Sequence, residues 1–513
     1  MLRPGLLQLT APRALGALAI VAISEDIGCR RVDRTRPHLS SAMTMHRVLL
    51  TIAAAVVTAS GANAQAPAEP REQREARDIL RELVNINSTS GTLGVGRAAR
   101  AMALRFRTAG YPAADVQLLG PSPQLTALVA RLRGRKTGQK PILLMAHLDV
   151  VAANRADWPF DPFTMIEKDG WYYGRGAEDN KAGVGTIVAN MVRWKREGWV
   201  PDRDIVAVLS ADEETNGASI AWLLKHHRAL LDAEYALNTD GGGGSLDKGK
   251  AVSNSVQASE KMFANFRIEV TNPGGHSSVP RRDNAIYELS ARLAAFGAFE
   301  YPRHLNEVSR AYFMQSAATQ SSDIAALMRA VAREPMDTAA AAKLSAANPY
   351  WNSIMRTTCV ATRLEAGHAD NALPQRASAL INCRILPDET VASVQATMQR
   401  VVGPGATVVK AWDAMLSPPS PLRADVMRVV TRLTSERFAG AVVVPEMSTG
   451  ATDGLFTRNA GIPTYGVSSV FFEQAEPSRA HGREERVGVK AYHDAVAFWY
   501  SMVKQLGTNS VTP

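Results

Sequence analysis

Apolar side chains recur at helical spacing along several stretches of the chain. Residues 71–86 are the clearest case, because their apolar positions fall on one side of a helix and their charges on the other. The apolar positions are Ile79, Leu80, Leu83 and Val84. The same spacing predicts further helices at about 94–109, 183–197 and 217–231.

Short apolar runs lie between and beside these helices and are predicted as strands. They cover residues 126–132, 141–146 and 204–210. Strands that alternate with helices are typical of a sheet whose two faces are covered by helices. The pattern therefore predicts an α/β fold, with a mostly parallel sheet and helices on both faces.

The pattern changes after about residue 260. Residues 266–270, 357–364 and 378–386 alternate in the manner of strands, and 283–297 and 389–401 are predicted as helices. This order favours a small antiparallel α+β unit. The alternating β/α order returns near 425–513, so the small unit is predicted to interrupt the larger one. The predicted domain parts are 65–260, 261–412 and 413–513. Residues 300–350 are helical and rich in alanine, without a recognisable motif.

The beginning of the chain resembles an export signal. Residues 45–64 combine a short basic start, an apolar stretch at 48–57 and the small-residue site Ala62-Asn63-Ala64. Cleavage is predicted after Ala64, which places the mature protein in the periplasm or outside the cell. An uncleaved anchor or a buried helix is the alternative. Residues 1–44 fit neither a signal nor a domain, so the natural start is predicted at Met43 or Met45.

Composition excludes several classes of protein. A chain of 513 residues with 46% hydrophobic and 21% charged residues has ample core and is not disordered. The net charge is +9, but the first 64 residues hold 7 basic and 3 acidic side chains and so account for +4 of it. No basic stripe interleaved with aromatics follows, and nucleic-acid binding is not expected. Three cysteines exclude a disulfide scaffold or a thiolate zinc cluster.

A histidine and an aspartate stand at the end of the apolar run 141–146. His147 and Asp149 are two residues apart, so they lie on one face of an extended chain. Ligands gather at the carboxyl ends of strands in a parallel sheet. A carboxylate at this spacing is able to orient a metal-binding imidazole. The alternative is a strand-end histidine with an ordinary hydrogen bond.

Four further elements carry acids or a histidine at similar places. Asp179 lies in a glycine-rich loop before a helix, where a helix cap is the alternative, and Glu213 and Glu214 close the run 204–210, where solvated surface acids are the alternative. Asp240 follows the apolar run 235–237, and His481 follows the stretch 450–469. Three acids and two histidines from these five elements are too many ligands for one tetrahedral site. They suit two divalent ions if one carboxylate bridges them.

In this order the motifs resemble those of the di-zinc exopeptidase family of carboxypeptidase S, glutamate carboxypeptidase, aminoacylase, Xaa-His dipeptidases and succinyl-diaminopimelate desuccinylase. The resemblance spans about residues 72–505 and is strongest to carboxypeptidase S and its bacterial relatives. It includes the segments WPFDPF at 158–163, GGHSS at 274–278, ADNALP at 369–374, NCR at 382–384 and GATDG at 450–454. The resemblance implies a catalytic domain interrupted by a lid domain that often forms a homodimer.

The family's metal ligands carry over residue by residue. One Zn²⁺ would be held by His147, Asp179 and Asp240. The other would be held by Asp179, Glu214 and His481, with Asp179 bridging the two ions. The resemblance also implies that Asp149 supports His147, that Glu213 is the proton shuttle, and that a cis peptide bond follows Asp179. Co²⁺ or Mn²⁺ would replace zinc in part.

The resemblance further implies a set of substrate contacts. His276 of the lid would donate a hydrogen bond to the developing oxyanion. Asn371 and Arg384 would contact substrate, Arg384 through a carboxylate. Gly450 and Thr452 are assigned to the substrate site in the same way. The alternatives are a strand arginine paired with a surface acid for Arg384 and a turn residue for Asn371.

Two positions depart from the family pattern. Leu455 stands where desuccinylases and aminoacylases carry an arginine, which argues against a desuccinylase. Arg458 lies three residues further on and is a possible substitute. Glu484 stands where the family has Asn or Asp.

The expected function is hydrolysis of the amide that releases a C-terminal amino acid from a peptide or an N-acyl amino acid. The enzyme alternatives are a dipeptidase and an N-acyl-amino-acid deacylase, and the remote alternative is a catalytically silent binding protein. After signal cleavage no membrane contact is expected.

Two cysteines are placed symmetrically about residue 371. Cys359 and Cys383 would face each other across an antiparallel pair of strands, within disulfide range. A shift of one residue in register would instead leave two buried free thiols.

Overall fold

The protein is described here by a computed structural model that covers residues 69–136, 138–476 and 478–508. The predicted export signal lies outside the described residues. Within them, no helix is both long and apolar enough to cross a membrane.

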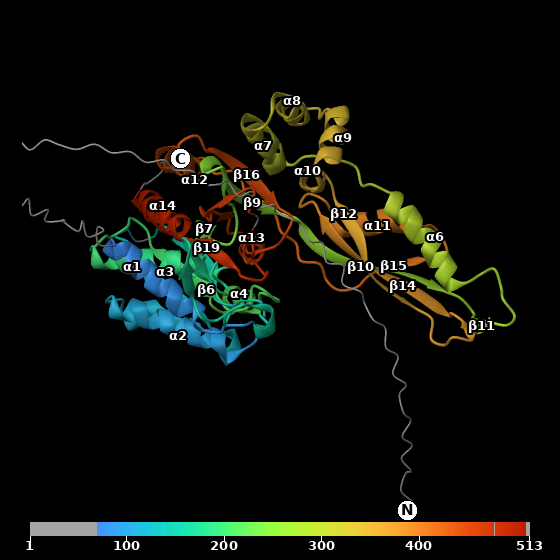
Figure 1. Ribbon diagram of the computed structural model, residues 1–513, viewed down its shortest axis with the longest axis horizontal. Coiled ribbons are helices and arrows are strands. Elements are labelled where there is room, and N and C mark those ends of the chain that lie inside the picture. The colour runs from blue at the N-terminus through green and yellow to red at the C-terminus, as the bar shows by residue number, and fades with distance from the viewer. Residues whose placement is uncertain (1–68, 137, 477, 509–513) are drawn as a thin grey trace, which may run out of the picture. The chain divides into compact units, whose positions relative to one another are not determined.

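A ten-stranded sheet forms the centre of the larger part of the fold (Figure 1). Its strand order is β1 (Val116–Leu119), β2 (Ala127–Leu132), β6 (Ile205–Ser210), β3 (Ile142–His147), β7 (Tyr235–Asn238), β17 (Thr464–Gly466), β9 (Lys250–Glu260), β8 (Gly243–Asp247) and β18 (Phe471–Glu473), with β16 (Val442–Ser448) paired to β9. The central strands β6, β3, β7 and β17 run parallel to one another.

Alternate side chains of the central strands enter two separate cores. In β3, Leu144 joins one buried cluster and Leu143 joins the other. The first cluster is covered by α1 (Arg71–Val84), α2 (Leu93–Thr108), α3 (Lys181–Arg196), α12 (Ala424–Arg437) and α14 (Val489–Thr508). The second is covered by α4 (Ala218–His226), α5 (Arg228–Leu231) and α13 (Gly454–Asn459). Because both faces are buried, the strands are continuously apolar, and the predicted fold class is confirmed.

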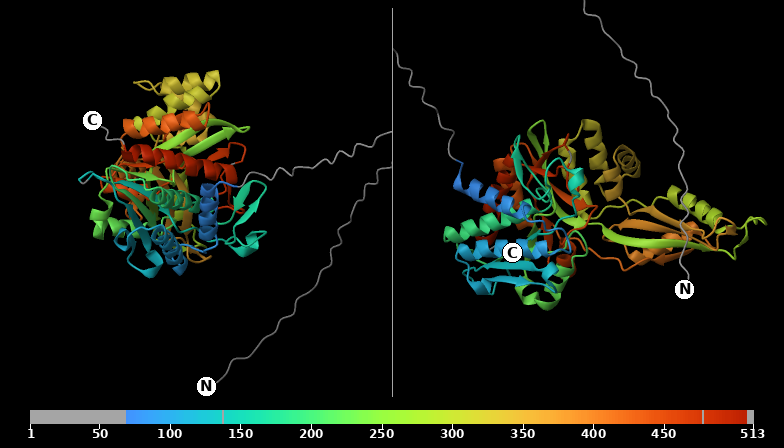
Figure 2. Two further views of the ribbon diagram at one scale, coloured as in Figure 1. Left: turned by 90° about the vertical axis from the view of Figure 1, so that its left-hand side faces the viewer. Right: turned by 60° about the horizontal axis from the view of Figure 1, so that its bottom comes forward.

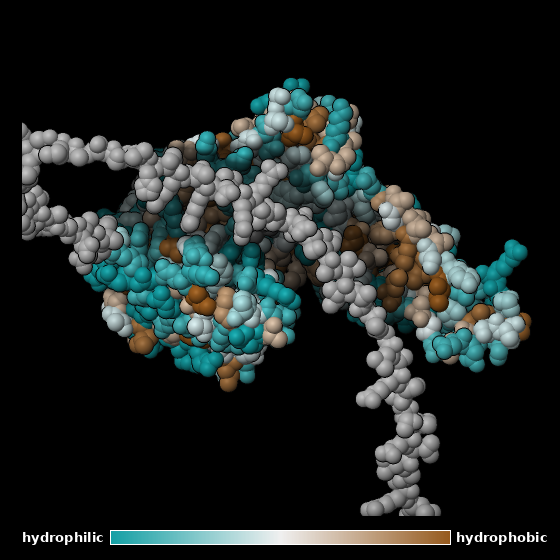
Figure 3. Space-filling view, in the orientation of Figure 1, coloured by the Kyte–Doolittle hydropathy of each residue, from teal (hydrophilic) through white to brown (hydrophobic). Residues whose placement is uncertain are grey.

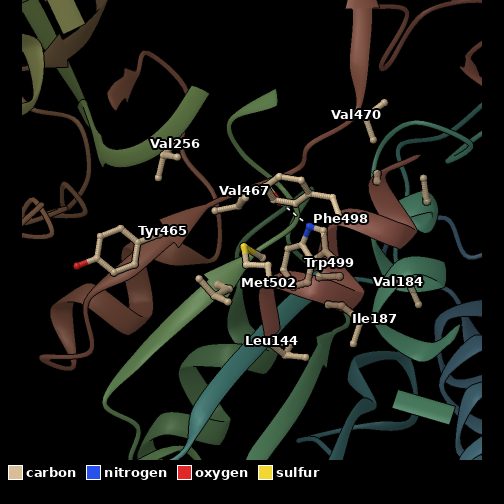
Figure 4. Packing of buried hydrophobic residues seen from close by; sticks show 14 of the residues in the cluster. Leu144, Val184, Ile187, Val256, Tyr465, Val467, Val470, Phe498, Trp499 and Met502 are labelled. Atoms are coloured by element: carbon tan, nitrogen blue, oxygen red, sulfur yellow. Dashed lines mark hydrogen bonds between the residues drawn. The ribbon is translucent and has the colours of Figure 1, made fainter. Parts of the chain in front are cut away.

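The first core is held by large side chains of α14 (Figure 4). Trp499 and Met502 pack near Leu144 and near Ile187 of α3. The buried indole of Trp499 donates its Nε1–H to the Val467 carbonyl at 2.7 Å, so its polar atom is not left without a partner. The C-terminal helix is thereby joined to the chain that follows β17.

A four-stranded antiparallel sheet forms the predicted lid. Its order is β12 (Thr358–Ala366), β14 (Arg376–Ile385), β10 (Met262–Thr271) and β15 (Thr407–Lys410). Helices α6 (Ala285–Ala298) and α11 (Val391–Val402) share a core with the sheet, and Figure 2 shows α6 lying along it. One face is covered and the other is not, which explains the alternating pattern of β10 and β14.

The alanine-rich region folds as four helices: α7 (Glu307–Ser316), α8 (Ser322–Val331), α9 (Thr338–Ala347) and α10 (Pro349–Ile354). The sequence analysis placed them in the lid range. Their buried side chains, such as Phe313 and Met328, instead belong to the cluster of the large sheet, and α7 packs on β16. Packing therefore joins these helices to the catalytic part, although the chain enters and leaves them within 261–412.

Cys359 and Cys383 lie opposite each other in β12 and β14 and form a disulfide, with their Cα atoms 4.1 Å apart. Of the two outcomes that the sequence left open, the structure has the disulfide and not the two free thiols. The register does shift, but only beyond the cysteines, between Ala361 and Arg363.

Two small sheets complete the fold. The first has the order β19 (Arg486–Gly488), β5 (Trp171–Tyr173) and β4 (Ile166–Lys168). The second pairs β11 (Gly275–His276) with β13 (Ala372–Leu373). The first lies next to the metal-binding candidates in sequence, and the second carries His276.

Candidate metal centre

Three neighbouring parallel strands bring most of the candidate ligands to one edge of the large sheet. His147 is the last residue of β3 and lies opposite Ser210, the last residue of β6. Met145 of β3 lies opposite Asn238, the last residue of β7. The residues just beyond these ends are Glu213, Glu214 and Asp240. The sheet topology therefore gathers segments that are far apart in sequence.

The loop of Asp179 is fixed against the loop of Asp240. The Asp179–Asn180 peptide bond is cis, as the resemblance implied. The Thr239 hydroxyl donates to the Asn180 side-chain oxygen at 2.8 Å and so links the two loops. Gly183 lies against this contact, and a Cβ there would be 2.1 Å from the Thr239 hydroxyl. The glycine is required by this close approach, so the motif that follows Asp179 has a structural reason.

The two carboxylate oxygens of Asp179 face two different histidines. His147 Nε2 lies 2.9 Å from Asp179 Oδ1 and 3.9 Å from Asp240 Oδ2. On the other side, His481 Nε2 lies 3.2 Å from Asp179 Oδ2 and 2.9 Å from Glu214 Oε2. The five side chains thus form two groups of three that share Asp179.

This donor set fits two divalent ions of the zinc type. Imidazole nitrogens and carboxylate oxygens are the ligands of such ions, and ligands of one tetrahedral zinc lie about 3.4 Å apart. The 2.9–3.9 Å separations between the side chains are centred on that value. Two sets of ligand atoms also lie within 4.8 Å of one another: His147 with Asp179 and Glu214, and His147 with Glu213 and Asp240. Glu213 belongs to the second of these sets. Its assignment as a proton shuttle, and not as a metal ligand, therefore stays a prediction.

The electrostatics of the centre favour bound cations. Burial, together with the charges of Asp453 and Glu214, raises the pKa of Glu213 to about 9. Burial and the charge of Asp179 also raise the pKa of Glu214. Burial would raise the pKa of Asp179 as well, but its hydrogen bonds with His147 and His481 outweigh burial and lower it. Several carboxylates therefore share more negative charge than the two histidines compensate, and divalent cations would relieve this.

Asp149 contacts His147 and also binds the backbone of Glu213 and Glu214. The Nδ1 of His147 lies 3.0 Å from the main-chain oxygen of Asp149 and 3.6 Å from its carboxylate, which leaves Nε2 to face the ligands. The carboxylate itself accepts the backbone N–H groups of Glu213 and Glu214, each at 3.1 Å. Ser90 donates to it at 2.6 Å. The carboxylate of Asp149 was expected to orient His147, but the main-chain oxygen is the nearer partner of Nδ1. The contact with the glutamates, 64 residues further along the chain, was not predicted.

His276 is the last residue of β11, and Asn371 lies in the turn directly before β13, as the alternative for Asn371 expected. Ser277 N–H donates to the Asn371 main-chain oxygen at 3.0 Å, and Ser278 Oγ lies 2.8 Å from His276 Nδ1. Both side chains are exposed. Among the described residues, no hydrogen bond joins either of them to the five candidate ligands. The structure brings these two residues to each other and not to the metal centre.

Arg384 lies half-buried on β14, with its guanidinium 5.0 Å from the ring centre of Phe263. Burial lowers its pKa. In residues 69–136, 138–476 and 478–508 no acidic side chain lies within ion-pair distance of it. The alternative of a strand arginine paired with a surface acid therefore finds no support.

Residues of the GATDG segment form hydrogen bonds with other parts of the protein. Thr452 is buried and donates to Glu260 at 2.6 Å, and Gly450 N–H donates to the Ser448 hydroxyl at 3.0 Å. Arg458 is also buried, with its guanidinium 2.9 Å from Glu260. Its guanidinium is paired with Glu260 in the protein interior and is not available to a substrate carboxylate. Arg458 therefore does not replace the arginine that is missing at position 455.

A cavity of about 230 Å³ adjoins the candidate centre. Asp179 and Asp240 form part of its wall, and the rest includes Thr186, Val470 and Phe472. The wall is partly apolar, which gives the centre a space next to its ligands for a substrate group.

Sequence reasoning missed a buried ion pair beside the centre. Arg175 and Glu485 are both buried, with Nη1 and Oε2 2.5 Å apart. Glu485 follows Glu484 in a run of charged residues, and Arg175 stands between two glycines. Neither position carries a sequence signal that distinguishes it from a solvated charge.

Comparisons with known proteins agree with this arrangement. The family model described as Peptidase family M20/M25/M40 matches residues 143–505. The N-fatty-acyl-amino acid synthase/hydrolase PM20D1 of Homo sapiens is 27% identical over 391 residues, which are 74% of this chain and 76% of that protein. Carboxypeptidase S of Saccharomyces cerevisiae is 30% identical over 270 residues, 50% of this chain and 46% of that protein.

A solved structure shows the same fold. The M20 family metallo-carboxypeptidase Sso-CP2 from Sulfolobus solfataricus aligns with a TM-score of 0.62 at 17% identity, over 84% of this chain and 99% of that one. The homologues are thus carboxypeptidases and N-acyl-amino-acid hydrolases, as the predicted enzyme class required. With a family match over more than two thirds of its length, the chain belongs to the peptidase family M20/M25/M40.

Proposed function

We propose that the protein hydrolyses the amide bond that releases a C-terminal amino acid from a peptide or an N-acyl amino acid, using two zinc ions. The observation that carries the proposal is the position of Asp179, whose two oxygens each face a histidine. The names of two relatives support the substrate class, because one names an N-fatty-acyl-amino acid and the other a carboxypeptidase.

The proposed ligand sets are His147, Asp179 and Asp240 for one ion, and Asp179, Glu214 and His481 for the other. When bound, the ions would lower the pKa of a water molecule and polarise the scissile carbonyl. Zinc suits this mixture of nitrogen and oxygen ligands, and Co²⁺ or Mn²⁺ would replace it in part.

Glu213 would take the proton of the attacking water and deliver it to the leaving amine. Its main-chain N–H is held by Asp149, so the carboxylate is presented at a fixed place beside His147 and Asp240. Burial keeps the pKa of Glu213 high, near 9, while no cation is present. Positive charge next to it would lower that pKa toward the range where a carboxylate exchanges protons at neutral pH.

Arg384 would bind the carboxylate of the leaving amino acid, with Asn371 and His276 beside the reacting carbonyl. The proposal is supported by the guanidinium of Arg384, which has no acidic partner among the residues the structure describes and therefore has its hydrogen-bond donors available. Gly450 and Thr452 would form the wall nearby, with Thr452 held by Glu260.

Export and dimerisation are also proposals. The Cys359–Cys383 disulfide supports an oxidising compartment, the periplasm or the exterior. A homodimer through the lid is supported by apolar side chains that stay exposed there, such as Leu364 with 67% and Tyr287 with 67% exposure. Figure 3 shows hydrophobic residues gathered over the part of the chain that holds α6 and the four-stranded sheet.

A substrate panel tests the proposal. An N-acyl amino acid, an N-acyl dipeptide, the C-terminal amide of that dipeptide and the free dipeptide are incubated with zinc-loaded protein, and the released amine is measured. We expect hydrolysis of the compounds that end in a free carboxylate and little of the amide. Equal rates on the acid and the amide would contradict the role of the carboxylate, and hydrolysis of the free dipeptide alone would indicate a dipeptidase.

A further inference from the structure

The buried pair Arg175–Glu485 connects the loops of Asp179 and His481, two of the three proposed ligands of the second ion. β5 and β19 run antiparallel, and Tyr173 lies opposite Arg486. The N–H of Gly174, the residue after Tyr173, donates to the main-chain oxygen of Glu485 at 3.0 Å. Arg175 follows Gly174, and its side chain meets that of Glu485 at the end of the strand pair. Their side chains are 3% and 1% exposed. Two charges are rarely buried unless both are paired and hydrogen-bonded.

Glu485 holds the loop of the bridging ligand. Its Oε1 accepts the backbone N–H groups of Glu178 and Asp179, each at 3.0 Å. Its Oε2 meets Arg175 Nη1 at 2.5 Å. Both oxygens are thus engaged, and one of the contacts is with the backbone of Asp179 itself.

Arg175 holds the loop of His481. Its Nη2 donates to the main-chain oxygens of His481 and Gly482, at 3.2 and 3.1 Å. His481 has a backbone φ of 63°, a left-handed conformation that residues other than glycine adopt at a cost. Its side chain is 54% exposed, so few packing contacts fix it from the solvent side. The bonds from Arg175 add to the turn bond from Gly482 N–H to the Arg479 main-chain oxygen and tie the loop to the buried end of the strand pair.

We infer that Arg175 and Glu485 are positioning residues that keep His481 and Asp179 at the separation the second ion requires. The inference rests on the ligand sets proposed above. Neither residue touches substrate or either ion in this account, and their effect reaches the centre through the backbone of the ligands. Asp179 belongs to both sets but His481 only to the second, so loss of the pair should weaken the second ion more than the first.

A second buried pair provides a matched control. Glu260 and Arg458 are 0% and 1% exposed, with an N–O distance of 2.9 Å. Their other partners include Thr452 and Ser417. No described contact of this pair involves any of the five candidate ligands. Neutralising either glutamate removes one buried charge, but only Glu485 contacts the backbone of a ligand.

The test measures the affinity of each ion in the absence of substrate. Zinc is titrated into chelated full-length protein against a coloured chelator, for the wild type and for Glu485→Gln, Arg175→Lys, Glu260→Gln and His481→Ala. The His481→Ala variant identifies which of the two affinities belongs to the second ion. We expect Glu485→Gln to weaken that affinity by about 10–100-fold and the first by less, as for other residues that orient metal ligands. Glu260→Gln should keep both.

Three results from the variants would overturn the inference. Two ions bound by Glu485→Gln with wild-type affinities would show that the pair does not position the ligands. Equal weakening of both ions, matched by Glu260→Gln, would show a general structural role. If Glu485→Gln does not fold, wild-type affinities in Arg175→Lys would overturn it instead. A wild type that binds only one ion would overturn the two-ion centre as well, whereas failure of the substrate panel alone leaves the inference intact.

Discussion

The metal centre and the lid are built in opposite ways. At the centre, side chains from three parallel strand ends and two loops are tied to one another by hydrogen bonds, many of them from the backbone. In the lid, the hydrogen bonds of His276 and Asn371 among the described residues are to neighbours in or beside the β11–β13 ribbon, and the guanidinium of Arg384 lies over the ring of Phe263. The difference indicates that the candidate ion ligands are preorganised, whereas no hydrogen bond among the described residues joins His276 or Asn371 to them.

Replacement of Glu213 by Gln should have the largest effect, because it removes the proton shuttle from the preorganised region. General base catalysis contributes roughly 10²–10⁴-fold, so kcat should fall by about that factor while zinc content stays at the wild-type level. Turnover and metal analysis of the same preparation check this. Glu214→Gln is the matched variant and should lose metal instead. If Glu213→Gln lost metal and Glu214→Gln kept it, Glu214 would be the proton shuttle and Glu213 the metal ligand.

Loss of the disulfide should destabilise the lid and leave the centre intact. The bridge joins residues separated by 24 positions, and closing a loop of that size contributes about 3 kcal/mol to the free energy of unfolding. The double variant Cys359→Ser/Cys383→Ser should show this loss in denaturant unfolding and still bind two ions. Two free thiols in denatured, unreduced wild-type protein would contradict the bridge itself.

Replacement of Arg384 by Met should affect only substrates with a free carboxylate. A charge-assisted contact contributes about 1.5–3 kcal/mol, so kcat/KM for an N-acyl dipeptide should fall at least tenfold, and that for its C-terminal amide should not change. Steady-state kinetics on both substrates measure the difference. Arg363→Met is the control, because that arginine is exposed on the same sheet and pairs with Glu365. An equal loss on acid and amide would remove Arg384 from carboxylate binding.

The chelated protein should lose stability as the pH rises. The pKa of Glu213 in the folded protein is about 9, above its ordinary value of 4.5. The protonated side chain therefore contributes fully to the free energy of unfolding below pH 4.5, and this contribution is lost as the pH rises toward 9. The raised pKa of His481, also about 9, has the same sign. Melting temperatures of chelated protein should therefore fall by a few degrees between pH 5 and pH 8, and Glu213→Gln should reduce the slope. A melting temperature that is flat or rises over this range would contradict the charge balance of the centre.

That the candidate ligands lie close together was predictable, because strand ends and acids coincide in the sequence. His147, Glu214 and Asp240 each follow an apolar run, and the resemblance supplied Asp179, His481 and the cis bond. The contacts of Asp149 with the glutamates and of Glu485 with Asp179 were not predictable, since the partners are 64 and 306 residues apart and carry no local pattern.

The domain arrangement shows a similar limit. Alternation in β10 and β14 predicted the lid sheet, because one of its faces is covered and the other is not. The packing of α7 on β16 was not predicted, since the apolar positions of one ten-residue helix do not indicate which sheet it contacts.

The most direct test of the account is a crystal structure of zinc-loaded protein with anomalous scattering measured at the zinc edge. We predict two peaks about 3.5–4 Å apart, one on each side of the Asp179 carboxylate. One peak should lie against His147 and Asp240, and the other against Glu214 and His481. A single peak, or a second one bound by Glu213 in place of Glu214, would contradict the two-ion centre bridged by Asp179.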